Sequence, residues 1–139
     1  MGFIRALIAF SGRALLVAIF FAGALVNLIP KFNDMVTLLA AEGVPEPRWA
    51  LIGAIACMLI GGVSVLLGFW ARLGALLLAI FLVATNYYIH DFWHFEGDRH
   101  QGEMIHFMKN AALLGAMVFI IGNGPGPGSV DKRKVTIAV

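Results

Sequence analysis

Charged side chains are scarce in this sequence. Only 13% of the 139 residues are Asp, Glu, Lys or Arg, whereas 60% are hydrophobic. A typical soluble domain has about 25% charged residues, and a chain this small cannot bury so much apolar surface in a core of its own. The composition therefore excludes an ordinary water-soluble domain and predicts an integral membrane protein with a single domain, residues 1–139.

Cysteine is nearly absent as well, since Cys57 is the single one and lies inside an apolar run. One thiol excludes an intrachain disulfide, a CxxC redox pair and an iron–sulfur cluster held by cysteines of this chain. The sequence also lacks a GxSxG motif and a phosphate-binding loop. Because no basic face with interleaved aromatic residues is present, we do not expect nucleic acid as a partner.

Four apolar runs are long enough to cross a bilayer, whose hydrocarbon core requires about 20 helical residues. They occupy residues 6–29, 49–70, 73–89 and 104–121. We therefore expect an all-α membrane protein, a four-transmembrane-helix bundle that contacts membrane lipids. The polar residues 90–103 should form an outer loop, and residues 123–139 a basic tail.

A shorter segment, residues 31–42, separates the first two spans. Its apolar residues Phe32, Met35, Val36 and Leu39 recur at i, i+3, i+4 and i+7, which places them on one helical face. We expect a short amphipathic helix that lies at the membrane surface or packs back against the bundle.

Small residues recur every four positions in the second span, at Gly53, Cys57 and Gly61. Such a stripe lets another helix approach closely, and close packing drives helix association inside a membrane. The approaching helix belongs either to the same chain or to another subunit, as in a homo-oligomer. The sequence leaves both alternatives open.

Four spans place both termini on the same side of the membrane. That side carries six basic residues and the other side four: Arg5, Arg13, Arg72, Lys132, Arg133 and Lys134 against Lys31, Arg48, Arg99 and Lys109. Cytoplasmic segments carry an excess of Lys and Arg. We therefore predict a multi-pass protein of the inner (cell) membrane with both termini in the cytoplasm.

Polar residues are concentrated in the stretch that joins the last two spans, where all four histidines and four of the eight acidic residues lie. His90 and His94 would share one helical face if the third helix extended that far. Glu103, His106 and Asn110 share a face of the fourth helix. Because a short connection joins these helix ends, we expect the two polar faces to converge.

Three interpretations of this stretch stay open. The histidine and glutamate spacings are typical of metal ligands, with His90, His94, Glu103 and His106 as candidates, but the apolar core lacks the further carboxylates of a di-iron site. A quinone headgroup could instead be hydrogen-bonded by His or Lys beside aromatic rings. In the third interpretation, the polar residues only cap helix ends at the water boundary. The candidate ligand-binding residues are Tyr87, His90, Asp91, Trp93, His94, His106, Lys109 and Asn110.

Lys109 lies about one turn inside the fourth span, where an unpaired ammonium group is costly. Its side chain either reaches outward to the interface or pairs with an acidic group such as Asp34, Asp91 or Glu103. We expect Lys109 to be the inner member of a polar cluster that also contains His106 and Asp91.

Six segments follow one another along most of the chain: FFAGALVNLIPKF at 20–32, GVP at 43–45, GGVSVLLGFWARLGA at 61–75, HDFWH at 90–94, HFMKNAALLGA at 106–116 and GPGPGSVD at 124–131. Together they resemble the DoxX family of small four-helix membrane proteins. Members of that family resemble the small subunits of a thiosulfate:quinone oxidoreductase or a terminal quinol oxidase. Others in the wider group act in oxidative-stress complexes, in assembly or as cargo receptors.

The resemblance implies one of two functions. The first is a quinone-interacting membrane subunit of a redox complex, with quinone as its cofactor and other redox-complex subunits as partners. The second is a non-catalytic structural, assembly or partner-docking module, so the resemblance does not decide whether the protein is an enzyme. Family members often carry a glutamate shortly before the paired glycines, where this chain has Met58. That departure weakens a proton-relay function inside the membrane.

Overall fold

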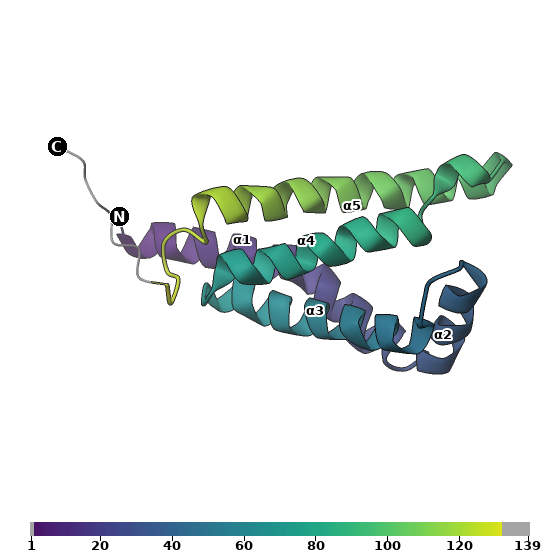
Figure 1. Cartoon of the computed structure of the whole chain (residues 1–139). Coiled ribbons are helices and arrows are strands. Elements are labelled where there is room, and N and C mark those ends of the chain that lie inside the picture. Colours follow the sequence, from purple (N-terminus) through teal and green to yellow (C-terminus); the bar gives the residue numbers. More distant parts are fainter. Residues whose placement is uncertain (1, 132–139) are drawn as a thin grey trace.

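The computed structural model describes residues 2–131, and the regular structure in that range is entirely helical (Figure 1). In chain order the elements are α1 (Gly2–Ala22), the π-helix η1 (Gly23–Leu28), α2 (Phe32–Ala41), α3 (Pro47–Leu67), α4 (Ala71–Tyr88), the 3-10 helix η2 (Phe92–His94) and α5 (Gly97–Asn123). Four of the described segments are long and apolar enough to cross a membrane: α1 with η1, α3, α4 with η2, and α5. The predicted all-α, four-span bundle is confirmed.

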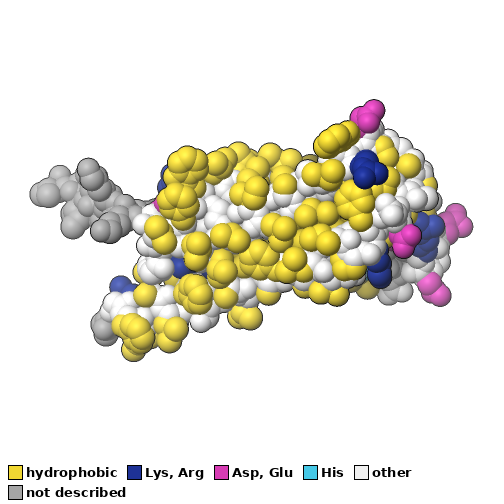
Figure 2. All heavy atoms as spheres, turned by 90° about the horizontal axis from the view of Figure 1, so that it is seen from below, with side chains coloured by type: hydrophobic (Ala, Val, Ile, Leu, Met, Phe, Trp, Pro, Cys, Tyr) yellow, Lys and Arg dark blue, Asp and Glu magenta, His cyan; other side chains and the backbone are white. Residues whose placement is uncertain are grey.

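The spanning helices pack in the order α1, α3, α4, α5. The start of α1, the α3–α4 turn and the segment after α5 lie at one end of the bundle, whereas α2 and the α4–α5 connection lie at the other (Figure 1). Apolar side chains cover the middle of the face drawn in Figure 2, and charged side chains gather toward its two ends. This distribution is that of a multi-pass protein embedded in a membrane.

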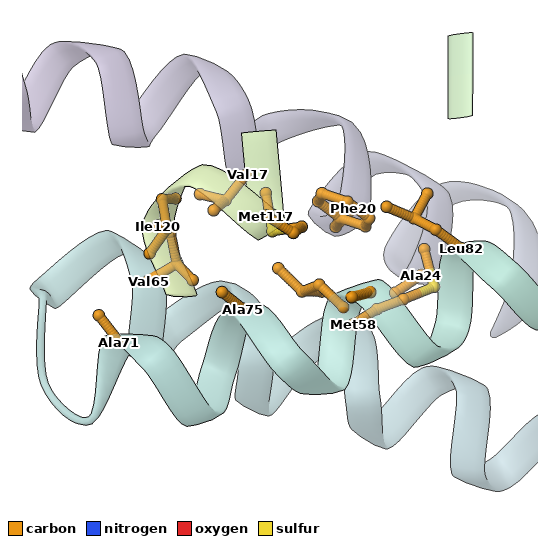
Figure 3. Packing of buried hydrophobic residues seen from close by; sticks show 12 residues of the cluster. Val17, Phe20, Ala24, Met58, Val65, Ala71, Ala75, Leu82, Met117 and Ile120 are labelled. Atoms are coloured by element: carbon orange, nitrogen blue, oxygen red, sulfur yellow. The ribbon is translucent and has the colours of Figure 1, made fainter. Parts of the chain in front are cut away.

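Side chains from all four spanning helices meet in the core (Figure 3). Phe20 of α1, Leu82 of α4 and Met117 of α5 are almost completely buried there. The approach of α3 to α4 depends on glycine, because a Cβ atom on Gly61 would lie 2.8 Å from the carbonyl oxygen of Gly74. One member of the small-residue stripe therefore packs within the chain.

Helix α2 packs back against the bundle through its apolar face. Phe32, Met35, Val36 and Leu39 are half-buried, whereas the other residues of the helix are exposed. These four positions match the predicted amphipathic pattern, and α2 contacts α3. Of the two predicted placements, the structure therefore adopts the one in which α2 lies against the bundle.

The boundaries of the last two helices differ from those predicted. Helix α5 begins at Gly97, so residues 97–103 are helical rather than part of a loop. Helix α4 ends at Tyr88, and His90 and His94 therefore do not share a face of it. The side chain of His90 bonds with Glu103, and that of Asp91 bonds with His94. Such side-chain hydrogen bonds compete with the backbone hydrogen bonds that would continue α4.

The segment after α5 folds back onto the bundle instead of leaving it as a free linker. Arg13 of α1 donates hydrogen bonds to the carbonyl oxygens of Pro125 at 2.7 Å and Gly128 at 2.9 Å. The Asp131 carboxylate accepts from the backbone N–H groups of Trp70 and Ala71, at 3.1 and 3.2 Å. Asp131 thus caps α4, and we call these contacts the terminal clasp. The remainder of the predicted basic tail lies outside the described residues.

Candidate functional site

A cavity of about 430 Å³ lies in the half of the bundle that contains α2. Its walls come from α1, η1, α2, α3, α4 and α5, and most of the lining is apolar, including Phe20, Leu39, Met58, Leu82 and Leu113. Its polar lining residues are Asn27, Thr85, His90, His106, Lys109 and Asn110. The cavity is therefore amphiphilic, with an apolar body and a group of convergent polar side chains, as in many small-molecule sites.

Helix α5 contributes the largest share of the polar lining. His106, Lys109, Asn110 and Leu113 follow one another at i, i+3, i+4 and i+7, which places them on one face of the helix, and all four line the cavity. Of the predicted α5 face, His106 and Asn110 line the cavity, whereas Glu103 lies outside the lining.

A hydrogen-bonded pair of amides, one buried and one half-buried, fixes this part of α5 against α4. The side-chain nitrogen of Asn110 donates to the side-chain oxygen of Asn86 at 3.0 Å. The nitrogen of Asn86 in turn donates to the carbonyl oxygen of Phe107 at 3.3 Å. Since Asn86 is only 8% exposed, these bonds satisfy groups that would otherwise be unpaired inside the membrane.

Four polar side chains form a continuous row from the end of the bundle into the cavity. Glu103 lies 2.7 Å from Nδ1 of His90. The His90 and His106 rings stack with their centroids 5.0 Å apart, and Nζ of Lys109 lies 3.1 Å from Nδ1 of His106. We call Glu103, His90, His106 and Lys109 the polar row.

The position of Lys109 differs from the expected cluster. Its ammonium group contacts His106, as expected, but within residues 2–131 it makes no ion pair with a carboxylate. Asp91 instead pairs with His94 at 2.5 Å. The two carboxylate–histidine pairs differ in their surroundings, because His90 lines the cavity and His94 is 66% exposed.

Half of the predicted ligand-binding residues line the cavity: His90, His106, Lys109 and Asn110. Tyr87, Asp91, Trp93 and His94 lie outside the lining. Trp93 packs edge-on against Phe92 and Phe107 in an aromatic group that closes the α4–α5 connection. Tyr87 is 66% exposed.

The metal candidates do not converge on a common point. Within the part of the chain that the structure describes, no group of three or more His, Cys, Asp and Glu side chains has an arrangement that could hold a metal ion. His90 and His106 lie face to face, with an angle of 17° between their rings, so their nitrogens do not aim at one ion. His94 is paired with Asp91.

Asn27 is a cavity residue that sequence reasoning missed. It lies in η1, where the hydrogen bond from Ile29 N–H to the carbonyl oxygen of Ala24 spans five residues and widens the helix. Single π-helical turns occur often at functional sites. The sequence shows Asn27 only as one amide in a long apolar run. Spanning helices often contain a single polar residue without a function, so this feature does not mark a site.

Residues 8–91 match the family model of DoxX. The chain belongs to the DoxX family. The inner membrane protein YphA of Escherichia coli is 32% identical to it over 102 residues, which cover 73% of each protein. The Surfeit locus protein 4 homolog of Schizosaccharomyces pombe is 27% identical over 99 residues, and the match spans 70% of this chain but 32% of that relative. No solved structure matches the chain. The family match ends at Asp91, so the cavity face of α5 lies beyond it.

Proposed function

We propose that this DoxX-family protein binds the headgroup of a membrane quinone in the cavity, as a membrane subunit of a redox complex. The observation that carries the proposal is the amphiphilic lining, an apolar body that meets His90, His106, Lys109 and Asn110. The volume of about 430 Å³ falls within the range of about 300–1,000 Å³ typical of small-molecule sites.

The chemistry of a quinone suits this lining. Its carbonyl oxygens accept hydrogen bonds, which the Lys109 ammonium group and the Asn110 amide can donate. Its ring can pack against the apolar wall, where many close contacts between carbon atoms add up to a favourable dispersion energy. Since the chain has one cysteine, electrons would reach or leave the quinone through a partner subunit that carries the redox centre.

The test is a titration of the purified protein, in nanodiscs of synthetic lipid, with a benzoquinone that carries a decyl tail. We expect saturable binding that Lys109→Met weakens about 10-fold or more, because a hydrogen bond to a charged group contributes about 1.5–3 kcal/mol. Arg99→Met is the matched control, since Arg99 lies on the same helix but packs over the Phe95 ring and does not line the cavity.

A second pair of variants separates the cavity from the rest of the surface. Ala54 lines the cavity, whereas nothing lies within 4 Å of a Cβ atom built on its neighbour Gly53. Ala54→Phe should abolish quinone binding by filling the space, and Gly53→Phe should leave binding intact. Absence of saturable binding in the unmodified protein, or equal loss in both variants, would contradict the proposal.

The alternative function, a structural or partner-docking module, relied on the small-residue stripe and on residues 31–42. The structure uses part of both within the chain, because Gly61 packs against α4 and the apolar face of α2 is turned to the bundle. A homo-oligomer or a redox partner would then contact other surfaces, such as the open side of Gly53. Unchanged complex size in Gly53→Phe would argue against that contact.

A further inference from the structure

His90 and His106 present different hydrogen-bonding groups, and their partners determine which. A carboxylate only accepts hydrogen bonds, so Nδ1 of His90, 2.7 Å from Glu103, carries a proton. An ammonium group only donates, so Nδ1 of His106, 3.1 Å from Nζ of Lys109, is the acceptor. The proton of the neutral His106 ring is therefore on Nε2.

The two rings stack beside the Lys109 ammonium group, with their centroids 5.0 Å apart and an angle of 17° between their planes. In the neutral form of each ring, Nε2 of His90 therefore has a free lone pair and Nε2 of His106 carries an N–H group.

The polar lining thus combines an acceptor with donors. His90 supplies a lone pair, while His106, Lys109 and the Asn110 amide supply N–H groups, and all four residues line the cavity. A ligand that only accepts hydrogen bonds would satisfy the donors and leave the His90 lone pair unpaired. A hydroxyl group satisfies both, because it donates one hydrogen bond and accepts others.

We propose that the cavity selects an aromatic hydroxyl, so that it binds the reduced hydroquinone form of its ligand more tightly than the oxidised quinone. This inference rests on the function proposed above and specifies which form of the ligand is held. Glu103 is the positioning residue, since its bond to Nδ1 keeps the His90 lone pair on Nε2. Sites that hydrogen-bond a hydroxyl discriminate strongly against analogues that lack it, because a buried polar group is then left unpaired.

The experiment compares three probes with the same decyl tail, in nanodiscs kept under anaerobic, reducing or oxidising conditions as each probe requires: a benzohydroquinone, its benzoquinone and its dimethyl ether. The ether retains the ring and the acceptor oxygens but cannot donate. We expect the hydroquinone to bind at least about 10-fold more tightly than either of the others, since the loss of one good hydrogen bond is worth about that factor.

Variants then test the role of the Glu103–His90 pair. In Glu103→Gln the amide can donate to Nδ1 of His90, which frees the ring to place its proton on Nε2, and the preference for hydroquinone should disappear. Glu103→Leu should also abolish it, and serves if the first variant does not fold. Asp91→Asn is the matched control, because Asp91 makes the corresponding pair with His94 away from the cavity lining.

The outcomes separate this inference from the proposed function. Equal affinities for hydroquinone and quinone would overturn the selectivity and leave quinone binding in place. Saturable binding of neither would overturn both. A preference that survives Glu103→Gln and Glu103→Leu, or that Asp91→Asn removes equally, would overturn the assignment to the Glu103–His90 pair.

Discussion

Arg13 is a charged residue inside a spanning helix, with only 4% of its surface exposed. Its guanidinium group is held by the carbonyl oxygens of Pro125 and Gly128. Proline has no backbone N–H group, so two of the five residues in the sequence GPGPG cannot donate a hydrogen bond. The carbonyl oxygens of this segment therefore need a hydrogen-bond donor from elsewhere in the chain. Arg13 supplies the missing donors where the surroundings offer few others.

Arg13→Met should therefore weaken the terminal clasp while keeping the length and apolar stem of the side chain. Hydrogen bonds to charged groups contribute about 1.5–3 kcal/mol each, and we expect the free energy of unfolding to fall by about 2 kcal/mol or more. Denaturant titration in detergent micelles, followed by circular dichroism, measures the change. Arg5→Met is the control, since Arg5 is exposed on the same helix, and an equal effect of both variants would refute the clasp.

The sequence could predict which residues lie together when they share one helix, because the helical repeat relates them. It could not predict contacts between residues that are far apart in the sequence. His106 and Asn110 were placed correctly on one face because both lie on α5 and the 3.6-residue repeat is local. Arg13 is separated from Pro125 by 112 positions, and no local pattern reports such a pairing. Asp131 caps α4 from 61 positions beyond Trp70, so no local pattern reports this contact either.

At the scale of elements, the α3–α4 crossing depends on two glycines. A Cβ atom on Gly61 would lie 2.8 Å from the carbonyl oxygen of Gly74, and one on Gly74 would lie 2.5 Å from the Ser64 side chain. Backbone atoms and a side chain held at the helix turn cannot move aside easily, so the two helices would have to separate. The crossing therefore tolerates no larger residue at either position without rearrangement.

Gly61→Ala should lower the free energy of unfolding by about 1–3 kcal/mol, the usual effect of overpacking. Gly53→Ala should be neutral or stabilising by up to about 1 kcal/mol, because the site has open space and alanine favours helix over glycine. The two thermal midpoints, measured on the same detergent-solubilised protein, give the comparison. Equal destabilisation by both would contradict the assignment of Gly61 to the chain's own packing.

The lengths of the apolar runs in the sequence predicted the four spanning helices, but they did not predict where α4 ends or where α5 begins. Apolar runs report the part of a helix that lies in the membrane, and the start of α5 at Gly97 lies outside such a run. Helix α4 ends at Tyr88, and His90 beyond it pairs with Glu103, a residue that becomes its neighbour only when the α4–α5 hairpin has formed. The cavity likewise depends on six elements at once, so the sequence could identify its polar residues but not the space between them.

For the whole molecule, the described ends of the chain lie together. The start of α1 and the segment after α5 are at one end of the bundle, and α2 and the α4–α5 connection are at the other (Figure 1). These two described ends of the chain therefore face the same side of the membrane. The cavity's polar row starts from Glu103 at the opposite end, so the orientation of the chain decides from which side of the membrane the proposed ligand site is reached.

The basic residues predict that the termini face the cytoplasm, with a bias of six to four. Green fluorescent protein fused after Val139 should fluoresce, and alkaline phosphatase inserted at Gly43, beyond α2, should be active outside the cytoplasm. Because so small a bias in Lys and Arg sets the orientation weakly, three lysines added around Gly43 should yield a mixture of both orientations. The same lysines added after Val139 should leave the population uniform. Inactive alkaline phosphatase at Gly43, together with a dark green fluorescent protein after Val139, would reverse the assignment and would place the entrance of the proposed ligand site on the cytoplasmic side.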